Sequence, residues 1–519
     1  MRNTMPFNDI VHGVFGRKVL TAPVEAITED NIVKIVGDCI GDFYFNKKAT
    51  EYLWRYFKGD QPILYRTKKV RSDVNNKVVE NHAYEIVEFK VGQTYGEPLQ
   101  CVSIEKENED IGKFVDALNK FLKLSNKHER NIRCGEWQSA TGTGFIAANF
   151  NRSRNRTCPF RLTVPTPMNT FIIYSSITEE PMVAVQELED IDGNSYKMCY
   201  TETQECKIVD SKVEDWHTHA FGGIPIVEYP NNAQRMSDLE IVITMLDAIN
   251  LFQSDRVNGL AQFIQSFIKF VNCEMDNEIF AKMKEQGAFV VKSNNGDNKA
   301  DVDIMSQELN QSESQVAKKD MMDNVLEVLA IPKLEGNTGG DTQGAVSLRN
   351  GWDMAKSRTK LKDPTVQESE KRLLQVILNI VRVELKENPC PIDVGQFDVI
   401  INHSPMDNML VKAQFLDYLL KDGVYPKLAF ELSTLFPDSE KAYAVSKPYL
   451  DALYSTRDEK EPDTKKTSAM VDLLVKLLNA GASVEDAIKI SGVDLDKNSQ
   501  NLKKWDYEPD DNGDGGGDE

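Results

Sequence analysis

The spacing of apolar residues along the chain changes between the period of a helix and the shorter period of a strand. Within the first 130 residues, segments 27–45 and 111–124 carry apolar side chains at helical spacing, which predicts two helices. Segments 62–70 and 83–91 are rich in β-branched and aromatic residues and are expected to be extended. The amino-terminal part is therefore predicted to mix helices with short strands.

Between about residues 140 and 230 the pattern becomes one of short strands separated by turn residues. The expected strands lie at 143–150, 160–167, 170–176, 182–188, 195–201 and 205–210. The stretch Asp-Ile-Asp-Gly-Asn at 190–194 resembles the start of a calcium-binding loop. However, Ser195 stands where that loop requires glycine, and no glutamate occupies the twelfth position, so a hairpin turn is predicted instead.

A long helical pattern begins at Ser237. Ser237 and Glu240 have the spacing of a capping box, in which the serine bonds forward and the glutamate bonds back to satisfy free backbone N–H groups. The apolar residues of this segment share one helical face: Leu239, Val242, Ile243, Leu246 and Ile249. A helix over 237–271 would be about 50 Å long, which indicates a structural strut.

A second helix is predicted at 313–330, with Ser312 as its cap and Gln315 three positions later. The polar segment 273–311 lies between the two helices and contains strand candidates at 288–292 and 301–305. The sequence therefore predicts the order long helix, compact insert, helix.

The carboxyl-terminal part also has helical periodicity. We expect a long helix over 345–386 with a kink at Asp363–Pro364, because proline cannot donate a backbone hydrogen bond. An extended segment at 396–402 precedes further helices, including a helical hairpin at 466–492. The acid- and glycine-rich end, 506–519, is expected to be disordered.

The net charge of the chain limits the classes of partner that it can bind tightly. Its 519 residues carry a formal net charge of −20, and seven carboxylates of the last fifteen residues account for part of this, leaving −13 elsewhere. A protein that grips DNA by neutralising phosphates should present a basic stripe. The composition therefore argues against tight DNA binding, although it does not exclude contact with DNA.

The sequence shows no compelling catalytic, cofactor or metal site. The eight cysteines form no Cys-x-x-Cys pair, and no apolar run approaches the ~18 residues that span a bilayer. His217 and His219 could share a strand face, and Asp301 and Asp303 form an Asp-x-Asp pattern, but neither set has further ligands at a useful spacing. We expect a solvent-facing pair and a polar strand face, respectively.

The glycine-rich stretch 336–344 resembles a phosphate-binding loop, because glycines precede a predicted helix. A P-loop requires Lys and Ser or Thr after its last glycine, whereas Ala345 and Val346 follow Gly344 here. Nucleotide binding is therefore not the preferred interpretation, and this loop needs another role.

The order of segments resembles the portal proteins of tailed double-stranded DNA phages, of the kind found in long-tailed phages. Four pieces carry the resemblance: 164–185, 221–258, 331–360 and 399–419. The second is the most specific, with a Gly-Ile-Pro strand that leads through an Asn-rich cap into a Leu-Asp-Ala-Ile-Asn helix. Gln343–Gly344 stands where family members often have Ser-Gly, and the first 130 residues match poorly.

The resemblance implies an α+β, mainly helical subunit with an α/β wing, a two-helix stem, a small α/β clip and a helical crown. The implied boundaries are as follows: wing, 1–236 and 346–400; stem, 237–272 and 312–330; clip, 273–311; tunnel loop, 331–345; crown, 401–505; acidic tail, 506–519. Such subunits form a ring of about twelve copies at one capsid vertex.

The glycine stretch would then belong to a tunnel loop that faces DNA in the central channel. The residues expected to face DNA are Lys333, Glu335, Asn337, Thr338, Gly339, Gly340, Asp341 and Gln343. Glycine would serve flexibility and close backbone approach. Lys333 is the one cation of this loop and the expected phosphate contact.

The implied role is mechanical rather than enzymatic: a channel for genome packaging and ejection. The implied partners are further copies of the chain, the terminase large subunit, the head–tail adaptor, the scaffold and the major capsid protein, with no membrane and no cofactor. DNA would pass without tight binding, and the protein would be found in the virion and, during assembly, in the host cytoplasm. Two other classes stay open: a different head–tail connector component, and a metal-dependent enzyme acting on nucleic acid.

Overall fold

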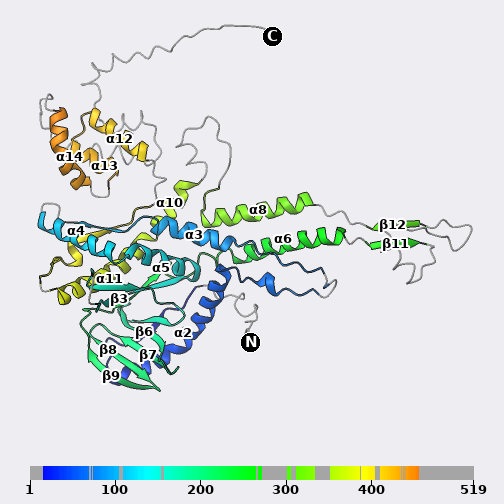
Figure 1. Cartoon of the computed structure of the whole chain (residues 1–519), viewed down its shortest axis with the longest axis horizontal. Coiled ribbons are helices and arrows are strands. Elements are labelled where there is room, and N and C mark those ends of the chain that lie inside the picture. Colours follow the sequence, from blue (N-terminus) through cyan, green and yellow to red (C-terminus); the bar gives the residue numbers. More distant parts are fainter. Residues whose placement is uncertain are drawn as a thin grey trace, which may run out of the picture. The chain divides into compact units, whose positions relative to one another are not determined.

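The computed structural model describes residues 16–68, 72, 74–104, 109–153, 157–264, 267–271, 301–305, 311–333, 351–385, 387–403, 409–433, 435–436 and 439–454. The chain divides into two compact units, Met1–Glu440 and Lys441–Glu519. Among the described residues more are helical than extended, which confirms the mixed, mainly helical fold class (Figure 1).

A six-stranded sheet has the strand order β1-β5-β6-β7-β8-β9. Its strands are β1 (Leu20–Ala22), β5 (Thr170–Ser175), β6 (Pro181–Glu189), β7 (Ser195–Tyr200), β8 (Gln204–Val209) and β9 (Lys212–Thr218). β1 pairs parallel with β5, and β5 to β9 form an antiparallel meander. Helix α2 (Glu29–Phe57) covers one face, where Ile32, Val36 and Phe43 are buried among apolar side chains of the sheet.

The hairpin turn predicted at 190–194 is confirmed. It joins β6 to β7, and Asp190 Oδ1 accepts hydrogen bonds from the backbone N–H groups of Asp192 at 2.9 Å and Asn194 at 2.8 Å. The short acidic side chain stabilises the turn by replacing a backbone acceptor.

A three-stranded sheet, in the order β10-β3-β4, lies between the larger sheet and a layer of helices. Its strands are β3 (Thr143–Phe150), β4 (Phe160–Thr163) and β10 (Ile226–Pro230). Ile146 and Ala148 of β3 join the core formed with α4 (Glu109–Leu124) and the other helices of this layer, whereas Phe145 and Ala147 pack with residues of β5 and β6. Burial of both faces explains why this strand is almost entirely apolar.

Helix α3 (His82–Tyr95) replaces the strand that was expected at 83–91, so that prediction is wrong. Its buried apolar residues, Ala83, Ile86, Val87, Val91 and Tyr95, share one face of the helix, as the helical period requires. The β-branched and aromatic content concealed this period. In the other expected extended segment, Pro62–Tyr65 forms a short 3₁₀ helix.

Strand β2 (Gln100–Ser103) pairs antiparallel with β13 (Phe397–Ile400), which lies within the segment expected to be extended at 396–402. A short 3₁₀ helix, Val394–Gln396, leads into β13. This pairing joins chain segments that are far apart in the sequence, so the late part of the chain belongs to the same core as the early part.

The predicted continuous helix over 237–271 is wrong. Residues 238–242 form turns, helix α6 spans Ile243–Ile264, and Phe267–Val271 is strand β11. β11 pairs antiparallel with β12 (Asp301–Met305), as expected for a strand at 301–305, whereas 288–292 lies outside the described residues. α6 is therefore about 33 Å long, shorter than the expected strut.

Helix α8 (Gln311–Leu329) begins slightly earlier than predicted, so Ser312 lies inside the helix instead of at its cap. The kinked helix expected over 345–386 is two helices in its described part: α10 (Trp352–Lys360) and α11 (Asp363–Glu384), with a turn between them. Pro364 lies in the first turn of α11, where its missing N–H costs no helical hydrogen bond.

Helix α5 (Lys127–Thr141) leads directly into β3 through Gly142, which has φ +94°. A Cβ atom there would lie 2.1 Å from the carbonyl oxygen of Arg235, so the close approach requires glycine.

The helices expected after residue 400 are present where the structure describes them: α12 (Met409–Lys421), α13 (Pro426–Ser433) and α14 (Ser439–Tyr454), most of which belongs to the second unit. The predicted hairpin at 466–492 and the acidic tail lie outside the described residues. No helix in the described ranges is long and apolar enough to cross a bilayer.

Candidate functional site: the α6–α8 helix pair

Helices α6 and α8 run antiparallel, side by side (Figure 1). Arg256 of α6 bonds Gln315 of α8, and Lys318 Nζ donates to Gln253 Oε1 at 3.4 Å. Their apolar faces meet in one buried cluster that includes Leu246, Ile249, Val325 and Leu329. The apolar face predicted for the segment after Ser237 is therefore the face of α6 that packs.

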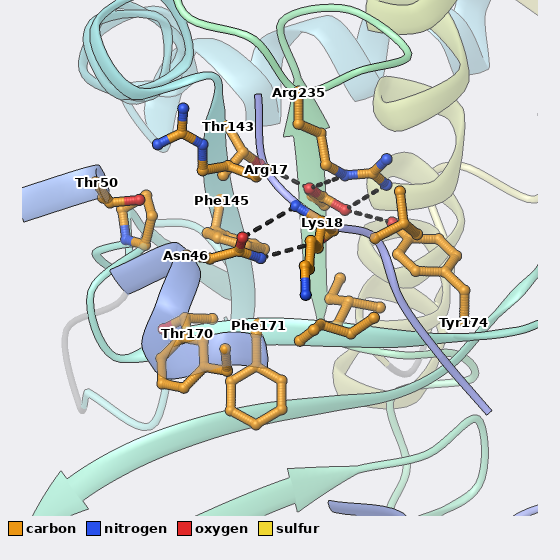
Figure 2. A pocket seen from close by; sticks show the side chains of 16 residues that line it. Arg17, Lys18, Asn46, Thr50, Thr143, Phe145, Thr170, Phe171, Tyr174 and Arg235 are labelled. Atoms are coloured by element: carbon orange, nitrogen blue, oxygen red, sulfur yellow. Dashed lines mark hydrogen bonds and ion pairs between the residues drawn. The ribbon is translucent and has the colours of Figure 1, made fainter. Parts of the chain in front are cut away.

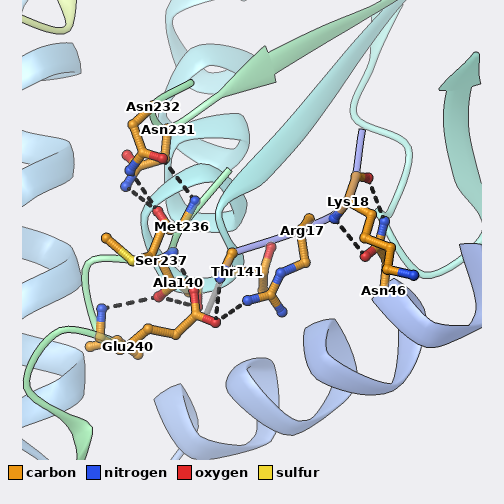
Figure 3. Close-up of polar contacts among 12 residues, drawn as sticks. Arg17, Lys18, Asn46, Ala140, Thr141, Asn231, Asn232, Met236, Ser237 and Glu240 are labelled. Carbon is orange, nitrogen blue, oxygen red and sulfur yellow. Dashed lines mark hydrogen bonds and ion pairs between the residues drawn. The ribbon is translucent and has the colours of Figure 1, made fainter. Parts of the chain in front are cut away.

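The base of α6 is fixed by a buried polar network (Figure 3). Only the backward bond of the predicted capping box forms: Glu240 Oε2 accepts from the Ser237 N–H at 2.6 Å. Ser237 Oγ accepts from the Leu239 N–H at 3.0 Å, and helix α6 begins only at Ile243, after the turns that these bonds hold. The Ser237 hydroxyl also donates to the carbonyl oxygen of Ala140 at 2.8 Å, at the end of α5. Arg17 forms a buried ion pair with Glu240. The network joins α5 and the residues before β1 to the start of the helix pair.

A second buried charge network lies between the two sheets (Figure 2). Glu228 of β10 accepts from Arg235 at 2.7 and 3.0 Å, from the Tyr174 hydroxyl at 2.6 Å and from the Thr143 hydroxyl at 2.8 Å. Burial acts to raise the pKa of Glu228, but Arg235 and the hydrogen bonds outweigh it and hold the pKa below its usual range. Two hollows adjoin this network: a cavity of about 40 Å³, which has room for water, and a larger open hollow of about 1090 Å³ that Tyr174, Glu228 and Arg235 also line.

One side of α6 carries a polar ladder that the sequence analysis did not identify. Asn250, Ser254 and Asn258 follow each other at four-residue intervals and are all buried. They accept hydrogen bonds from three alternate backbone N–H groups of an extended segment: Asn250 Oδ1 from Glu80 at 2.8 Å, Ser254 Oγ from Val78 at 2.9 Å and Asn258 Oδ1 from Asn76 at 2.6 Å. The ladder fixes residues 76–80 along the helix.

The carboxyl end of α8 is held by two cations. Lys90 Nζ of α3 donates to the Leu329 carbonyl oxygen at 2.6 Å, and Arg358 Nη1 of α10 donates to the Val328 carbonyl oxygen at 2.5 Å. Cations at this position satisfy free carbonyl groups and complement the helix dipole. Burial lowers the pKa of Lys90, although Asp238 opposes the shift. These contacts fix the point at which the chain leaves α8.

The helix ends in a Schellman motif. The N–H groups of Ala330 and Ile331 donate to the carbonyl oxygens of Glu327 at 3.0 Å and Leu326 at 2.8 Å. Ala330 has φ +52°, a left-handed conformation in which glycine is usual. The motif turns the chain sharply into the segment that the sequence analysis assigned to a tunnel loop.

Lys333 is the only one of the eight expected DNA-facing residues that the structure describes. Its Nζ lies 3.6 Å from Asp323 Oδ1 of α8, and both side chains are partly exposed. The others lie outside the described residues: Glu335, Asn337, Thr338, Gly339, Gly340, Asp341 and Gln343.

The helix pair is acidic. Over the lengths of α6 and α8, six carboxylates stand against three cations. One carboxylate, Asp247, lies against α2, where the Tyr56 hydroxyl donates to it at 2.9 Å. Burial raises the pKa of Asp247 to about 6, with the Tyr56 hydrogen bond opposing the shift. The pair thus presents no basic stripe.

The other candidate ligands have separate partners. His217 Nε2 lies 2.8 Å from Glu205 Oε1, and His219 Nε2 lies 2.9 Å from the Thr201 carbonyl oxygen. Asp301 and Asp303 belong to β12. In the part of the chain that the structure describes, no group of three or more His, Cys, Asp and Glu side chains could hold a metal ion.

Three solved structures illustrate what the chain is similar to, each at 12% identity. A chain in the neck of a native GTA particle computed with C12 symmetry has a TM-score of 0.41, with 75% of this chain and 94% of that chain covered. A chain in the neck of an empty GTA particle computed with C6 symmetry has a TM-score of 0.42, with 75% of this chain and 94% of that chain covered. A chain in the virion of a native gene transfer agent (GTA) particle has a TM-score of 0.40, with 76% of this chain and 93% of that chain covered.

No curated protein matches the chain. A family model described as "Phage portal protein, SPP1 Gp6-like" matches residues 45–439, from the middle of α2 to the start of α14. This match spans well over half of the sequence and includes the three-stranded sheet, strands β5 to β9 of the larger sheet and the α6–α8 pair. The chain therefore belongs to the SPP1 Gp6-like family of phage portal proteins.

Proposed function

We propose that this phage portal protein forms a closed ring of about twelve copies at one capsid vertex, through which double-stranded DNA is packaged and later ejected. In this proposal α6 and α8 form the stem, 273–311 the clip between them, and 331–345 the tunnel loop. Residues 1–236 and 346–400 form the wing, 401–505 the crown and 506–519 an acidic tail.

The observation that carries the proposal is the anchored, antiparallel α6–α8 pair. A stem must keep its shape while DNA and docked partners load it, and this pair is fixed along α6 by the polar ladder and at the end of α8 by Lys90 and Arg358. Both sets of contacts come from residues far away in the sequence. The helix pair is therefore built as a rigid support with a defined starting point for the loop.

The negative charge of the helix pair also supports a role as a channel for DNA. Each phosphate–cation contact adds affinity that must be lost before DNA can advance. A helix pair with six carboxylates and three cations repels the DNA backbone and favours sliding. Lys333, at the end of the described segment after α8, provides an isolated phosphate contact rather than a continuous basic track.

The proposed role has a sequence of partners. The terminase motor docks on the clip and supplies the energy for packaging, and a head–tail adaptor later replaces it. The scaffold and the major capsid protein surround the ring during assembly in the host cytoplasm, and the ring remains in the virion. The chain supplies the aperture and the docking surfaces, consistent with membership in a structural family.

The test is particle shape and mass, measured on the purified full chain by negative-stain electron microscopy and native mass spectrometry. Rings with a central hole and a mass of about twelve subunits are expected. The measurement is repeated with the capsid scaffold present if the chain alone stays monomeric. Absence of rings under both conditions would overturn the proposal.

A further inference from the structure

Two cysteines lie directly opposite each other in the six-stranded sheet. Cys199 of β7 and Cys206 of β8 are register partners in an antiparallel hairpin, and each is only 1% exposed. Both are free thiols, and both belong to the apolar cluster beneath α2. Neither has a role in the portal function proposed above.

Their backbone positions are compatible with a disulfide. Directly opposed residues in antiparallel strands have Cα atoms about 4.5–5.5 Å apart, within the range of about 4.4–6.8 Å that disulfides adopt. Their Cβ atoms, about 4.5–5.5 Å apart in such pairs, must approach to about 3.5–4.5 Å. The strands can supply this small movement, and the resulting strain makes the bond easy to reduce.

The two thiols are also chemically unequal. The hydrogen bond between them, with Cys199 as donor, raises the pKa of Cys199 and lowers the pKa of Cys206. Among the other described cysteines, burial raises the pKa of the thiols of Cys39, Cys101, Cys134, Cys158 and Cys390. Because the thiolate is the reactive form, Cys206 is the preferred nucleophile.

We propose that Cys199 and Cys206 are a redox modification site, at which a peroxide converts the folded chain to a form with a reversible β7–β8 disulfide. The Cys206 thiolate attacks one peroxide oxygen, the O–O bond breaks, and the leaving oxygen departs as water after protonation. The Cys199 sulfur then attacks the Cys206 sulfenic acid, forms the S–S bond, and releases a second water. Two thiols are oxidised and one hydrogen peroxide is reduced to two waters.

Access follows from the position of the hairpin in the sheet. β8 is next to β9, and β9 is the edge strand. The pair lies near this edge but under α2, so a small oxidant such as hydrogen peroxide reaches it through local opening of α2 and the sheet edge, without global unfolding. The disulfide then links two adjacent strands by a covalent bond close to their turn.

The chain offers a sharp readout, because cleavage after Lys197 and Lys207 releases residues 198–207 as one peptide with both cysteines. The folded full chain is treated with hydrogen peroxide, quenched, alkylated under denaturing conditions, digested and analysed by mass spectrometry. The expected peptide is lighter than its reduced form by two hydrogen atoms and carries no alkyl group. Treatment with dithiothreitol before alkylation restores a peptide with two alkyl groups.

Two controls decide the outcome. Cys206→Ser must abolish the loss of two hydrogens at residues 198–207, and peptides with Cys101 or Cys134 must stay alkylated in the treated wild type. The proposal is overturned if both thiols of the treated wild type remain alkylated, or if they oxidise separately to sulfinic acids. A disulfide that forms only in denaturant overturns it as well, because the fold would then not position the pair.

Discussion

The backbone N–H of Val78 donates a hydrogen bond to Ser254 Oγ at 2.9 Å, across 176 positions of sequence. This bond is the middle rung of the polar ladder formed by Asn250, Ser254 and Asn258. Four residues of helix rise about 6.0 Å, and two residues of an extended chain span about 6.6 Å. The near match lets one face of a helix bond every second N–H group of an extended segment.

Asn250→Ala is expected to destabilise the helix pair. The change removes the acceptor of the Glu80 N–H and the buried bond from Asn250 Nδ2 to Gln61. A buried group left without its partner costs about 1–3 kcal/mol. Chemical denaturation should show the loss, and hydrogen exchange should show faster exchange of the Glu80 amide.

Thr244→Ala on the same helix is the matched control, because the Thr244 side chain is exposed and lies on α6 outside the ladder. It should leave both the denaturation midpoint and the Glu80 exchange rate nearly unchanged, since surface substitutions usually change stability by less than about 0.5 kcal/mol. Equal effects of the two variants would show that α6 is sensitive to any truncation and would contradict a specific role of the ladder.

The ladder shows where sequence reasoning succeeded and where it did not. The apolar face of the segment after Ser237 was predicted correctly, because burial of Leu246 and Ile249 follows from a strong helical period. Asn250, Ser254 and Asn258 look like an ordinary solvated face, since their partners are backbone groups without a sequence signature. The recurrence of small polar residues every four positions was the available signal.

Helix α3 was mistaken for a strand for a related physical reason. Its β-branched and aromatic residues favour strands locally, but burial of Ile86 and Val87 in the apolar cluster that α3 shares with α2, α5, α6 and α8 overrides that preference. Four strands of the six-stranded sheet, β5 to β8, lie at expected positions, because turn residues bound them, whereas β1 and β9 were not predicted. Of the predicted tunnel loop, residues 331–333 lie in the described part of the chain.

Asp247→Asn is expected to stabilise the protein at neutral and alkaline pH. The folded-state pKa of Asp247, about 6, lies above the ordinary value of 3.8, so the folded state binds the proton more tightly than the unfolded state. The stability associated with this proton is present at low pH and is lost as pH rises through about 6. Asparagine keeps an acceptor for the Tyr56 hydroxyl without the buried charge. At pH 8 the free energy of unfolding should therefore rise by at most about 3 kcal/mol.

Denaturation of wild type and Asp247→Asn from pH 4 to pH 8 measures this difference in free energy of unfolding, which should shrink towards zero at about pH 4.

Asp255→Asn provides the opposite case on the same helix. Burial acts to raise the pKa of Asp255, but Arg66 and Lys68 outweigh it and the pKa is lowered. Because this pair is exposed, its loss should destabilise the protein by under about 1 kcal/mol at neutral pH. A pH-independent gain for Asp247→Asn would refute the assignment.

Arg235→Met should destabilise the contact between the two sheets strongly. It leaves the Glu228 carboxylate buried with only the Tyr174 and Thr143 hydroxyls, and breaking one side of a buried ion pair costs about 3–5 kcal/mol. Without Arg235, burial raises the pKa of Glu228, so the variant should recover stability as the pH falls. The double variant Arg235→Met, Glu228→Gln should restore much of the loss at neutral pH; no recovery would show that packing, not charge, dominates.

Ala330→Gly is expected to stabilise the end of α8 by about 1 kcal/mol, because an L-residue in the left-handed conformation costs about 1–2 kcal/mol and glycine loses part of this gain through unfolded-state entropy. Ala317→Gly, the same change inside α8, should instead destabilise by about 1 kcal/mol. Thermal denaturation of the two variants should therefore show shifts of opposite sign. Shifts of the same sign would contradict the Schellman assignment.

Lys333→Ala tests the proposed contact with DNA. The ion pair of Lys333 with Asp323 is partly exposed and therefore worth only about 0–1 kcal/mol, so a DNA phosphate can compete for the lysine. Removal of the cation should lower the amount of DNA packaged and retained, while ring assembly seen by electron microscopy stays normal.

Asp323→Asn breaks the same ion pair but keeps the lysine, and should preserve packaging. Lys319→Ala, an exposed lysine on the same helix, controls for the loss of one positive charge. If Lys333→Ala packages and retains DNA like wild type, Lys333 is not the phosphate contact. If Asp323→Asn packages as little DNA as Lys333→Ala, the ion pair is required instead of the contact with DNA.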